Sequence, residues 1–154
     1  MNQKTNWLTD KNYRFIYKQV PRACVDVLIF TKNGFLLSKR DIPPHKGLWH
    51  FTGGRVYLNE RIQEAVRRIA ATETGVKLKE IKPLGFCEIF IPSGPNFHDI
   101  SLVFKAKIKS GKIRGSAQAQ EIKAFKKIPG EMVPAHKRFL KANWREIRKI
   151  LNRY

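Results

Sequence analysis

Residues 53–75 read GGRVYLNERIQEAVRRIAATETG and join a glycine loop to an amphipathic helix. The two glycines that open the segment allow unusual backbone angles, and they let the loop amides approach a charged ligand closely. The helix is predicted to begin with Asn59 as its N-cap and Glu60 in its first turn, where the helix dipole favours a negative charge. Gly75 is its predicted C-terminal stop. We therefore expect the chemistry of the chain at this segment.

The inward face of this helix carries an unusual carboxylate. Its apolar residues recur at the three- and four-residue spacing of one buried face: Ile62, Ala65, Val66 and Ile69. At ~100° per residue, Glu73 lies within roughly 20° of Ile62 on that face. A buried carboxylate near a helix C-terminus opposes both desolvation and the dipole, so it needs a compensating cation. Arg55 or a metal ion would supply it; alternatively, the last turn frays and Glu73 reaches water.

The composition describes a basic globular chain. Its 154 residues, of which 42% are hydrophobic, predict one domain over residues 1–154 with a sizeable core. The 31 Lys and Arg residues exceed the 12 Asp and Glu residues and give a formal charge of +19. This balance favours phosphate-rich partners, such as nucleotides, nucleic acid or anionic lipid surfaces. The alternative is a generally solvated cationic surface, because the basic residues are scattered along the whole chain.

The cysteines and the hydrophobic runs indicate the compartment. Cys24 and Cys87 lie in apolar runs typical of strands, lack metal-ligand spacing, and are expected to be buried free thiols in a reducing cytosol. The polar N-terminus lacks the apolar core of a signal peptide, and the longest hydrophobic run, Val25–Phe30, is too short to span a bilayer. The sequence therefore predicts a cytoplasmic protein with no membrane partner.

The chain before the glycines predicts a lead-in helix within residues 1–20 and then a hairpin. The apolar strands of this hairpin, 23–30 and 34–40, flank an Asn-Gly turn. Asp26 interrupts the first strand, so it either faces a cleft or sits at an exposed pleat position. His50, in the aromatic stretch before the glycines, is expected to face solvent or to find a partner within the sheet.

The chain after the central helix predicts three more strands and one helix. Strands at 84–91 and 100–108, with a turn at 92–96, form a second hairpin. Residues 122–128 are predicted as an edge strand. Residues 135–152 are predicted as one amphipathic helix, whose basic face is either solvated or binds nucleic acid. These elements predict an α/β chain of the α+β type, in which a mixed sheet lies between helices.

The central segment also carries a known pattern in Gly54, Glu60, Arg68, Glu73 and Gly75. Their spacing resembles the Nudix box, in which three carboxylate positions follow the arginine. Ile69 and Thr72 occupy two of those positions here, and only Glu73 remains. Losing two anionic oxygen ligands should severely weaken a cluster of magnesium ions.

One Nudix branch, the GDP-mannose mannosyl hydrolases, resembles the chain at these same deviations. The resemblance implies a Nudix-like mixed sheet sandwiched between helices, and attack at the anomeric carbon of a nucleotide sugar. It implies that Glu73 and the backbone carbonyl of Gly53 hold one Mg²⁺, that Arg40 and Arg55 grip the diphosphate, and that Asp26 lines the sugar side. One ion suffices because it only neutralises the charge that builds on the leaving diphosphate.

The family's general base is the feature that this sequence lacks. The family places a metal-binding glutamine and a histidine base shortly before the final strand, where this chain has Ala119 and Gln120. A shift of one or two residues brings Gln118 or Gln120 to the metal-ligand place, but neither glutamine accepts a proton at neutral pH. Glu121 or His98 would then substitute as the base. His98 is the better chemical candidate because its unperturbed pKa is near neutrality, and the alternative for it is an exposed turn residue.

The sequence thus predicts a magnesium-dependent Nudix hydrolase acting on a nucleoside diphosphate sugar. Two alternatives remain. One is an ordinary nucleoside di- or triphosphate pyrophosphohydrolase that uses Glu60, Glu64 and Glu73. The other is a catalytically impaired domain that binds nucleotide or RNA through its basic surface. The resemblance also makes a homodimer an expected partner state.

Overall fold

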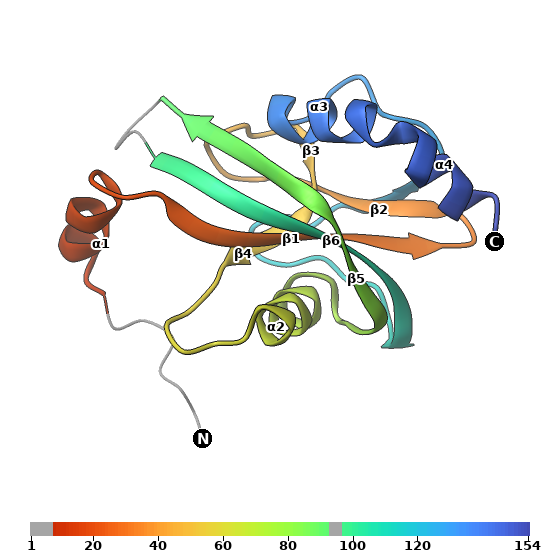
Figure 1. The fold of residues 1–154 in the computed structure, drawn as a ribbon, viewed down its shortest axis with the longest axis horizontal. Coiled ribbons are helices and arrows are strands. Elements are labelled where there is room, and N and C mark those ends of the chain that lie inside the picture. Colours follow the sequence, from red (N-terminus) through yellow and green to blue (C-terminus); the bar gives the residue numbers. More distant parts are fainter. Residues whose placement is uncertain (1–7, 93–96) are drawn as a thin grey trace.

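The computed structural model describes residues 8–92 and 97–154, in which four helices and seven strands form (Figure 1). The helices are α1 (Asp10–Tyr17), α2 (Ile62–Thr74), α3 (Pro134–Ala142) and α4 (Trp144–Leu151). The strands are β1 (Arg22–Thr31), β2 (Gly34–Lys39), β3 (Trp49–His50), β4 (Thr52–Arg55), β5 (Val76–Ile91), β6 (Phe97–Gly111) and β7 (Ile122–Phe125). None of the described helices has the length and apolar character needed to cross a membrane.

All seven strands belong to one mixed sheet with β1 at its centre. The main path runs β3-β2-β1-β6-β5, with β4 paired to β1 and β7 paired to β2. β1 is parallel to β6 but antiparallel to β4 along Cys24–Val27 and to β2 at Phe30 and Thr31. The predicted first hairpin is therefore confirmed, and so is the α+β fold class with a mixed sheet.

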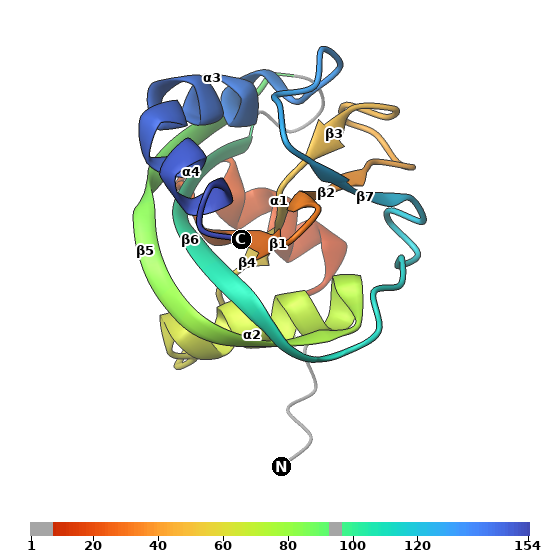
Figure 2. The ribbon, with the colours of Figure 1, turned by 90° about the vertical axis from the view of Figure 1, so that its right-hand side faces the viewer.

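Helices cover both faces of this sheet. α2 lies on one face, while α3 and α4 lie on the other, and α1 stands beside the start of β1 (Figures 1 and 2). The core under α2 contains the predicted inward residues Ala65, Val66 and Ile69, which are almost fully buried. A second core joins α3 and α4 to the other face through Phe139, Leu140 and Ile147. Because β1 is covered on both faces, every residue from Val25 to Phe30 is buried.

The start of α2 differs from the prediction. The helix begins at Ile62 with Arg61 as its N-cap, so Asn59 is not the cap and Glu60 lies before the first turn. Asn59 instead has a positive φ of 63°, which ends the preceding turn. Glu64 takes the acidic place in the first turn, where its carboxylate accepts the Arg61 backbone N–H at 3.2 Å. Gly75 closes the helix in the left-handed conformation, as predicted.

Other boundaries also differ. β5 and β6 pair antiparallel as a second hairpin, but they are far longer than predicted, because three register shifts let the strands bend without separating. Residues 93–96 of its predicted turn lie outside the described residues, as do residues 1–7 of the lead-in segment. β7 ends at Phe125 rather than 128, and the predicted C-terminal helix is two helices that meet at Asn143.

Candidate active site

The cleft that contains the predicted site has a volume of about 490 Å³ and opens where β1 begins. Its walls come from α1, the starts of β1 and α3, the strand β4 and the C-terminal end of α2. Five residues predicted for substrate or metal meet here: Asp26, Arg40, Gly53, Arg55 and Glu73. Residues up to 47 positions apart in the sequence thus converge, because β4 returns antiparallel to β1 and α2 comes next in the chain.

Gly53 separates the two carboxylates of the cleft. Val56 N–H donates to the carbonyl of Ala23, so the alternation of the β1–β4 ladder makes Asp26 and Gly53 a non-hydrogen-bonded pair. The N–H and C=O of Gly53 consequently point away from β1, and the N–H donates to the carboxylate of Glu73. On the other side, a Cβ at Gly53 would stand 1.9 Å from Asp26 Oδ1. Only glycine fits between Asp26 and the backbone here.

Glu73 lies on the inward face of α2, as predicted. Its burial raises the pKa to about 7, and the negative charge of Asp26 adds to the rise. The Gly53 amide, Arg40 and Arg68 act in the opposite direction. The protein's own cations that favour ionised Glu73 are thus Arg40 and Arg68, not the predicted Arg55. They offset the cost of ionising Glu73 only in part, because its pKa is still raised.

The two predicted diphosphate-binding arginines are held in different ways. Arg40 donates its Nε–H to the carbonyl of Pro44 at 2.7 Å, so the loop after β2 folds around its side chain. Arg55 lies over the rings of Tyr13 and Tyr17, with its guanidinium carbon 4.9 Å from the Tyr13 centroid. Its Nη1 is buried without a hydrogen-bond partner among the described residues. A buried donor without an acceptor indicates a place for an anion.

Asp26 is buried and faces the cleft, so the prediction of an exposed pleat position is wrong. The reason is that β1 is an interior strand with both faces covered. Ser101 donates its hydroxyl to Asp26 Oδ2 at 2.5 Å, and the Cys87 thiol lies 4.0 Å from the same oxygen. Burial raises the pKa of Cys87 to about 12, so the thiol keeps its proton. Oδ2 is thus committed to the protein, while Oδ1 lies beside Gly53.

Two histidines of the cleft present opposite hydrogen-bonding groups. The backbone N–H of Phe51 donates to His136 Nδ1 at 3.2 Å, so the proton of a neutral His136 is on Nε2, which lies 3.5 Å from Asp26 Oδ2. His50 Nδ1 lies 2.6 Å from the carbonyl of Phe51 and must donate to it, which leaves a lone pair on Nε2. Burial lowers the pKa of His50 to about 4, so His50 stays neutral. Of the two expectations for His50, solvent exposure is wrong and the partner within the sheet is right.

Asp26, Cys87 and His136 also place ligand-type atoms within 4.8 Å of one another. A metal-bound histidine normally donates its other ring N–H to an acceptor. Here the other nitrogen, Nδ1 of His136, accepts an N–H from Phe51 instead. The proton of His136 is then on Nε2, which has no lone pair for a metal, so Cys87 and His136 surround Asp26 with donors rather than form a metal site with it.

Asp99 is the third carboxylate of the cleft, and an arginine neutralises it. Arg22 binds both oxygens of Asp99, at 2.5 and 2.7 Å, and donates to the hydroxyl of Tyr13 at 2.6 Å. This pair ties α1 to the starts of β1 and β6. Asp99 is consequently not available as a metal ligand or a base, which distinguishes it from Asp26.

The remaining predicted site residues lie elsewhere. His98 stacks on Phe90 and stands 3.4 Å from Glu88, outside the residues that line the cleft. Glu121 is half-buried and pairs with Lys39 and Lys123. Gln120 is exposed, and its backbone N–H donates to Asp41. Its neighbour Gln118 does line the cleft.

The other box carboxylates do not meet Glu73. Glu60 binds Arg68 through both of its oxygens, at 2.6 and 2.8 Å, and Arg68 also donates to the backbone carbonyl of Arg55 at 2.9 Å. Glu64 caps Arg61. Glu60 and Arg68 thus brace the loop that carries Arg55 instead of binding a ligand.

Sequence reasoning missed Ser101, His136 and Asp99. Each lies in a segment with an ordinary amphipathic pattern, and only the fold brings it to Asp26 or Arg22. A polar residue at an inward strand position, such as Ser101, was the one available signal. Two arginines beside a buried carboxylate and outward-turned peptide groups are typical of a site for a phosphate ester with a hard cation.

Comparisons with known proteins agree with this class. The model of the family described as "NUDIX domain" matches residues 20–153. The chain belongs to the Nudix family, and it is a hydrolase of that family.

Three similar proteins illustrate the relationship. The chain is 27% identical over 146 residues to the low-salt glycan biosynthesis protein Agl8 of Haloferax volcanii, covering 92% of this chain and 94% of that protein. It is 33% identical over 115 residues to an ADP-ribose pyrophosphatase of Methanocaldococcus jannaschii, covering 75% of this chain and 66% of that one. A MutT NUDIX hydrolase from Burkholderia pseudomallei superposes with a TM-score of 0.71 at 25% identity, over 79% of this chain and 97% of the other.

Proposed function

We propose that the chain hydrolyses a nucleoside diphosphate sugar with the help of Mg²⁺, by attack of water at the anomeric carbon. The observation that carries this proposal is that one box carboxylate, Glu73, reaches the cleft, while Glu60 and Glu64 are engaged elsewhere. A single carboxylate and one ion are enough to neutralise a leaving diphosphate. They are a poor set for activating a water at phosphorus, which in this family is the work of several ions.

The residues around Gly53 fit a magnesium ion. The carboxylate of Glu73 and the carbonyl of Gly53 lie on the same side of β4, and hard cations prefer such oxygen donors. Ionised Glu73 is disfavoured by burial and by Asp26, so a cation would relieve both costs. When bound, the ion would stabilise the negative charge that develops on the departing diphosphate.

Arg40 and Arg55 are proposed to hold the diphosphate. Both line the cleft with Glu73, and the unpartnered Nη1 of Arg55 is free to donate to a phosphate oxygen. The tyrosine rings against Arg55 fix the plane of its guanidinium, which reduces the entropy lost on binding. His136 Nε2–H would donate a hydrogen bond to one hydroxyl of the sugar, and His50 Nε2 would accept one from another.

Asp26 is proposed as the proton acceptor. It is the cleft carboxylate that neither pairs with an arginine nor faces the Gly53 amide, and its Oδ1 is the oxygen left open by Ser101. In the proposed step the oxygen of water bonds to the anomeric carbon, and the bond from that carbon to the phosphate oxygen breaks. The proton of the water passes to Asp26, and the electron pair leaves with the nucleoside diphosphate.

The similar proteins support a substrate of this kind in part. One is named for glycan biosynthesis and another for hydrolysis of ADP-ribose, a nucleoside diphosphate joined to a sugar. The second candidate function is therefore cleavage between the two phosphates of such a compound. It is favoured by the 33% identity to the ADP-ribose pyrophosphatase.

Isotope labelling separates the two reactions. Purified protein with Mg²⁺ would be incubated with GDP-mannose, ADP-ribose and other nucleotide sugars in H₂¹⁸O, and the products analysed by ³¹P NMR and mass spectrometry. The proposal requires ¹⁸O in the released sugar and none in the phosphates. Label in a phosphate would establish the second candidate instead. Nucleotide binding without turnover would identify an impaired binding domain.

The same proposal includes the extent of the domain, the cellular compartment and the oligomeric state. We propose that residues 1–154 form one domain, since the match to the family begins at 20 and reaches 153. Free thiols at Cys24 and Cys87 suit the reducing cytoplasm. A homodimer is proposed from the resemblance, and light scattering of the purified protein would test it.

A further inference from the structure

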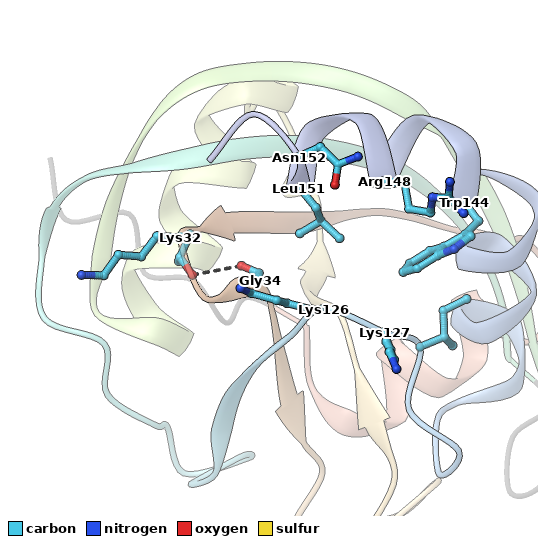
Figure 3. Close-up of a pocket in the computed structure, with 10 residues that line it drawn as sticks. Lys32, Gly34, Lys126, Lys127, Trp144, Arg148, Leu151 and Asn152 are labelled. Atoms are coloured by element: carbon cyan, nitrogen blue, oxygen red, sulfur yellow. Dashed lines mark hydrogen bonds between the residues drawn. The ribbon is translucent and has the colours of Figure 1, made fainter.

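A second hollow, of about 640 Å³, is drawn in Figure 3, and it shares no lining residue with the cleft. It is enclosed by α4 on one side and by the β1–β2 turn and the segment after β7 on the other. The cleft is lined by the first half of β1, whereas this hollow begins at the last residue of that strand, Thr31. Asp26 is the β1 residue of the cleft nearest to Thr31, five residues before it, so at about 3.3 Å per residue the strand separates the two sites by roughly 17 Å at their nearest.

The charged residues that line this hollow are all basic: Lys32, Lys126, Lys127 and Arg148. Four lysines elsewhere in the described part of the chain have acidic partners: Lys39 and Lys123 pair with Glu121, Lys105 with Glu146, and Lys107 with Glu80. Within residues 8–92 and 97–154, the four cations of the hollow form no such ion pair. Like charges gathered without a counter-charge repel one another, and a bound anion removes that cost.

The same hollow has an aromatic and aliphatic floor. The indole of Trp144 and the side chain of Leu151 extend from α4 into the space, close to Arg148 and opposite Lys126 (Figure 3). Trp144 meets Phe35 edge-on, with 6.3 Å between ring centroids, which fixes its orientation. A fixed indole beside unpaired cations can bind a planar ring and its phosphates together.

We propose that this hollow is a second binding site and that it takes a nucleoside phosphate. The base stacks on Trp144, and the phosphate oxygens pair with Lys126, Lys127 and Arg148. Neither a phosphate alone nor a hydrophobic ligand alone would use both features of the hollow. The nucleoside phosphate comes either from a free nucleotide or from the end of a single-stranded RNA, and the two sources share this chemistry.

Tryptophan fluorescence tests the site directly. ADP and a 5′-phosphorylated oligoadenylate would be titrated at ionic strength of about 0.15 M. We expect either ligand to quench the emission of the wild-type protein and the variant Trp144→Phe to lose that quenching. Quenching by ADP assigns a free nucleotide, and quenching by the oligomer alone, with a salt-dependent affinity, assigns a strand.

Matched variants test whether the ligand binds in this hollow. The double variant Lys126→Gln/Lys127→Gln should weaken binding about ten-fold or more, since two charge-assisted contacts are lost. The control Lys141→Gln/Lys149→Gln removes the same charge from exposed positions that do not line the hollow, and it should bind normally. Arg55→Gln alters the cleft and should keep the quenching.

Three results would overturn the proposal. One is equal weakening in the two double variants, which would mean diffuse attraction to a basic surface. The second is unaltered affinity in Lys126→Gln/Lys127→Gln, and the third is no quenching by either ligand. Hydrolysis in the cleft is expected to be unchanged in Lys126→Gln/Lys127→Gln, so the outcome here is independent of whether the proposed reaction is right.

Discussion

At the scale of single residues, Asp26 differs from its two neighbouring carboxylates by its partners. Arg22 neutralises Asp99, and the Gly53 amide faces Glu73, whereas Asp26 receives neutral donors on one oxygen only. A hydroxyl that donates to Oδ2 fixes the carboxylate without satisfying its charge. The oxygen that remains can accept a proton from a water or a sugar hydroxyl.

Asp26→Asn tests this role. An amide cannot accept the proton, so we expect kcat to fall by about 10²–10⁴-fold while substrate still binds. Steady-state kinetics and a separate binding titration would measure the two quantities. Asp10→Asn, at an exposed position on α1, is the matched control and should be near wild type. A variant Asp26→Asn with unchanged kcat would exclude Asp26 as the acceptor.

The adjacent glycines Gly53 and Gly54 are expected to respond differently to substitution by alanine. In Gly53→Ala the new methyl would meet Asp26 Oδ1 at 1.9 Å and the Val25 carbonyl at 2.8 Å, so β4 must shift. In Gly54→Ala it would meet only the flexible end of Ile69, at 3.3 Å. We expect Gly53→Ala to lower the free energy of unfolding by roughly 1–3 kcal/mol and to lose most activity.

Denaturant unfolding and kinetics of both variants check this expectation. Gly54→Ala is expected to change stability by less than about 1 kcal/mol and to keep its activity. Equal behaviour of the two variants would contradict the close approach of Asp26 to Gly53.

At the scale of elements, the loop between β4 and α2 depends on the pair of Glu60 and Arg68. This pair brings one turn of α2 against the backbone of Arg55, and Arg68 also lies over the ring of Tyr57, 3.8 Å from its centroid. The hydrogen bond from Arg68 lowers the pKa of Glu60, so the pair stays charged at neutral pH. The position of Arg55 is thus set by an arginine that does not itself line the cleft.

Arg68→Gln should therefore affect binding more than the chemical step. We expect a loss of roughly 1–3 kcal/mol in the free energy of unfolding and a raised KM, because the loop that carries Arg55 loosens. Arg67→Gln, one residue away on the exposed side of α2, is the control and should change neither quantity measurably. A lowered kcat at unchanged KM in Arg68→Gln would contradict this positioning role.

The sequence predicted elements better than it predicted their ends. Periodicity identified α2 and its inward Glu73, because side-chain pattern is a local property. The helix start was misplaced because Glu60 prefers the guanidinium of Arg68, eight residues away, to the helix N-terminus. The prediction of a single C-terminal helix was wrong at Asn143, where the chain breaks into two helices. The apolar stripe continues through this break, and no Gly or Pro marks the break in the sequence.

The part of the site built from residues close together in the sequence was predictable. The part that depends on contacts between distant segments was not. The residues of the glycine loop and its helix follow a recognisable spacing, and three predicted site residues among them, Gly53, Arg55 and Glu73, meet in the cleft. The support of Asp26 comes from Ser101, 75 residues away, and from His136 on another element. Such contacts depend on the parallel pairing of β1 with β6 and on the placement of α3, which no local pattern encodes.

At the scale of the whole molecule, β1 connects the two proposed anion-binding sites, which are lined by different groups. The cleft at its start joins arginines to buried carboxylates, which suits a phosphate with a cation. The hollow at its end has cations and an indole but no acidic lining residue, which suits a nucleoside phosphate bound without a metal ion. In these proposals, basic residues of a chain with a formal charge of +19 serve a site at each end of the central strand.

The stability of the whole molecule should depend on pH through the half-buried Glu73 and the buried His50, which have opposite effects. Burial raises the pKa of Glu73 from 4.5 to about 7, so between these values the folded protein binds a proton that the unfolded chain releases. Without metal, this group makes the free energy of unfolding fall as pH rises through that window. Burial lowers the pKa of His50 from 6.5 to about 4, so its contribution rises with pH over that range.

Removal of metal reveals the effect of Glu73 ionisation on the free energy of unfolding. In EDTA, we expect Glu73→Gln to be more stable than wild type above pH 7, by on the order of 1–3 kcal/mol, and equal to it near pH 4. Added Mg²⁺ should reverse the order at pH 8, because the cation binds the ionised carboxylate and stabilises only the wild type. Urea unfolding from pH 4 to 8, with EDTA or Mg²⁺, measures both effects. Parallel curves for the two proteins in EDTA would mean that Glu73 is not held in the buried position that its place beside Gly53 requires.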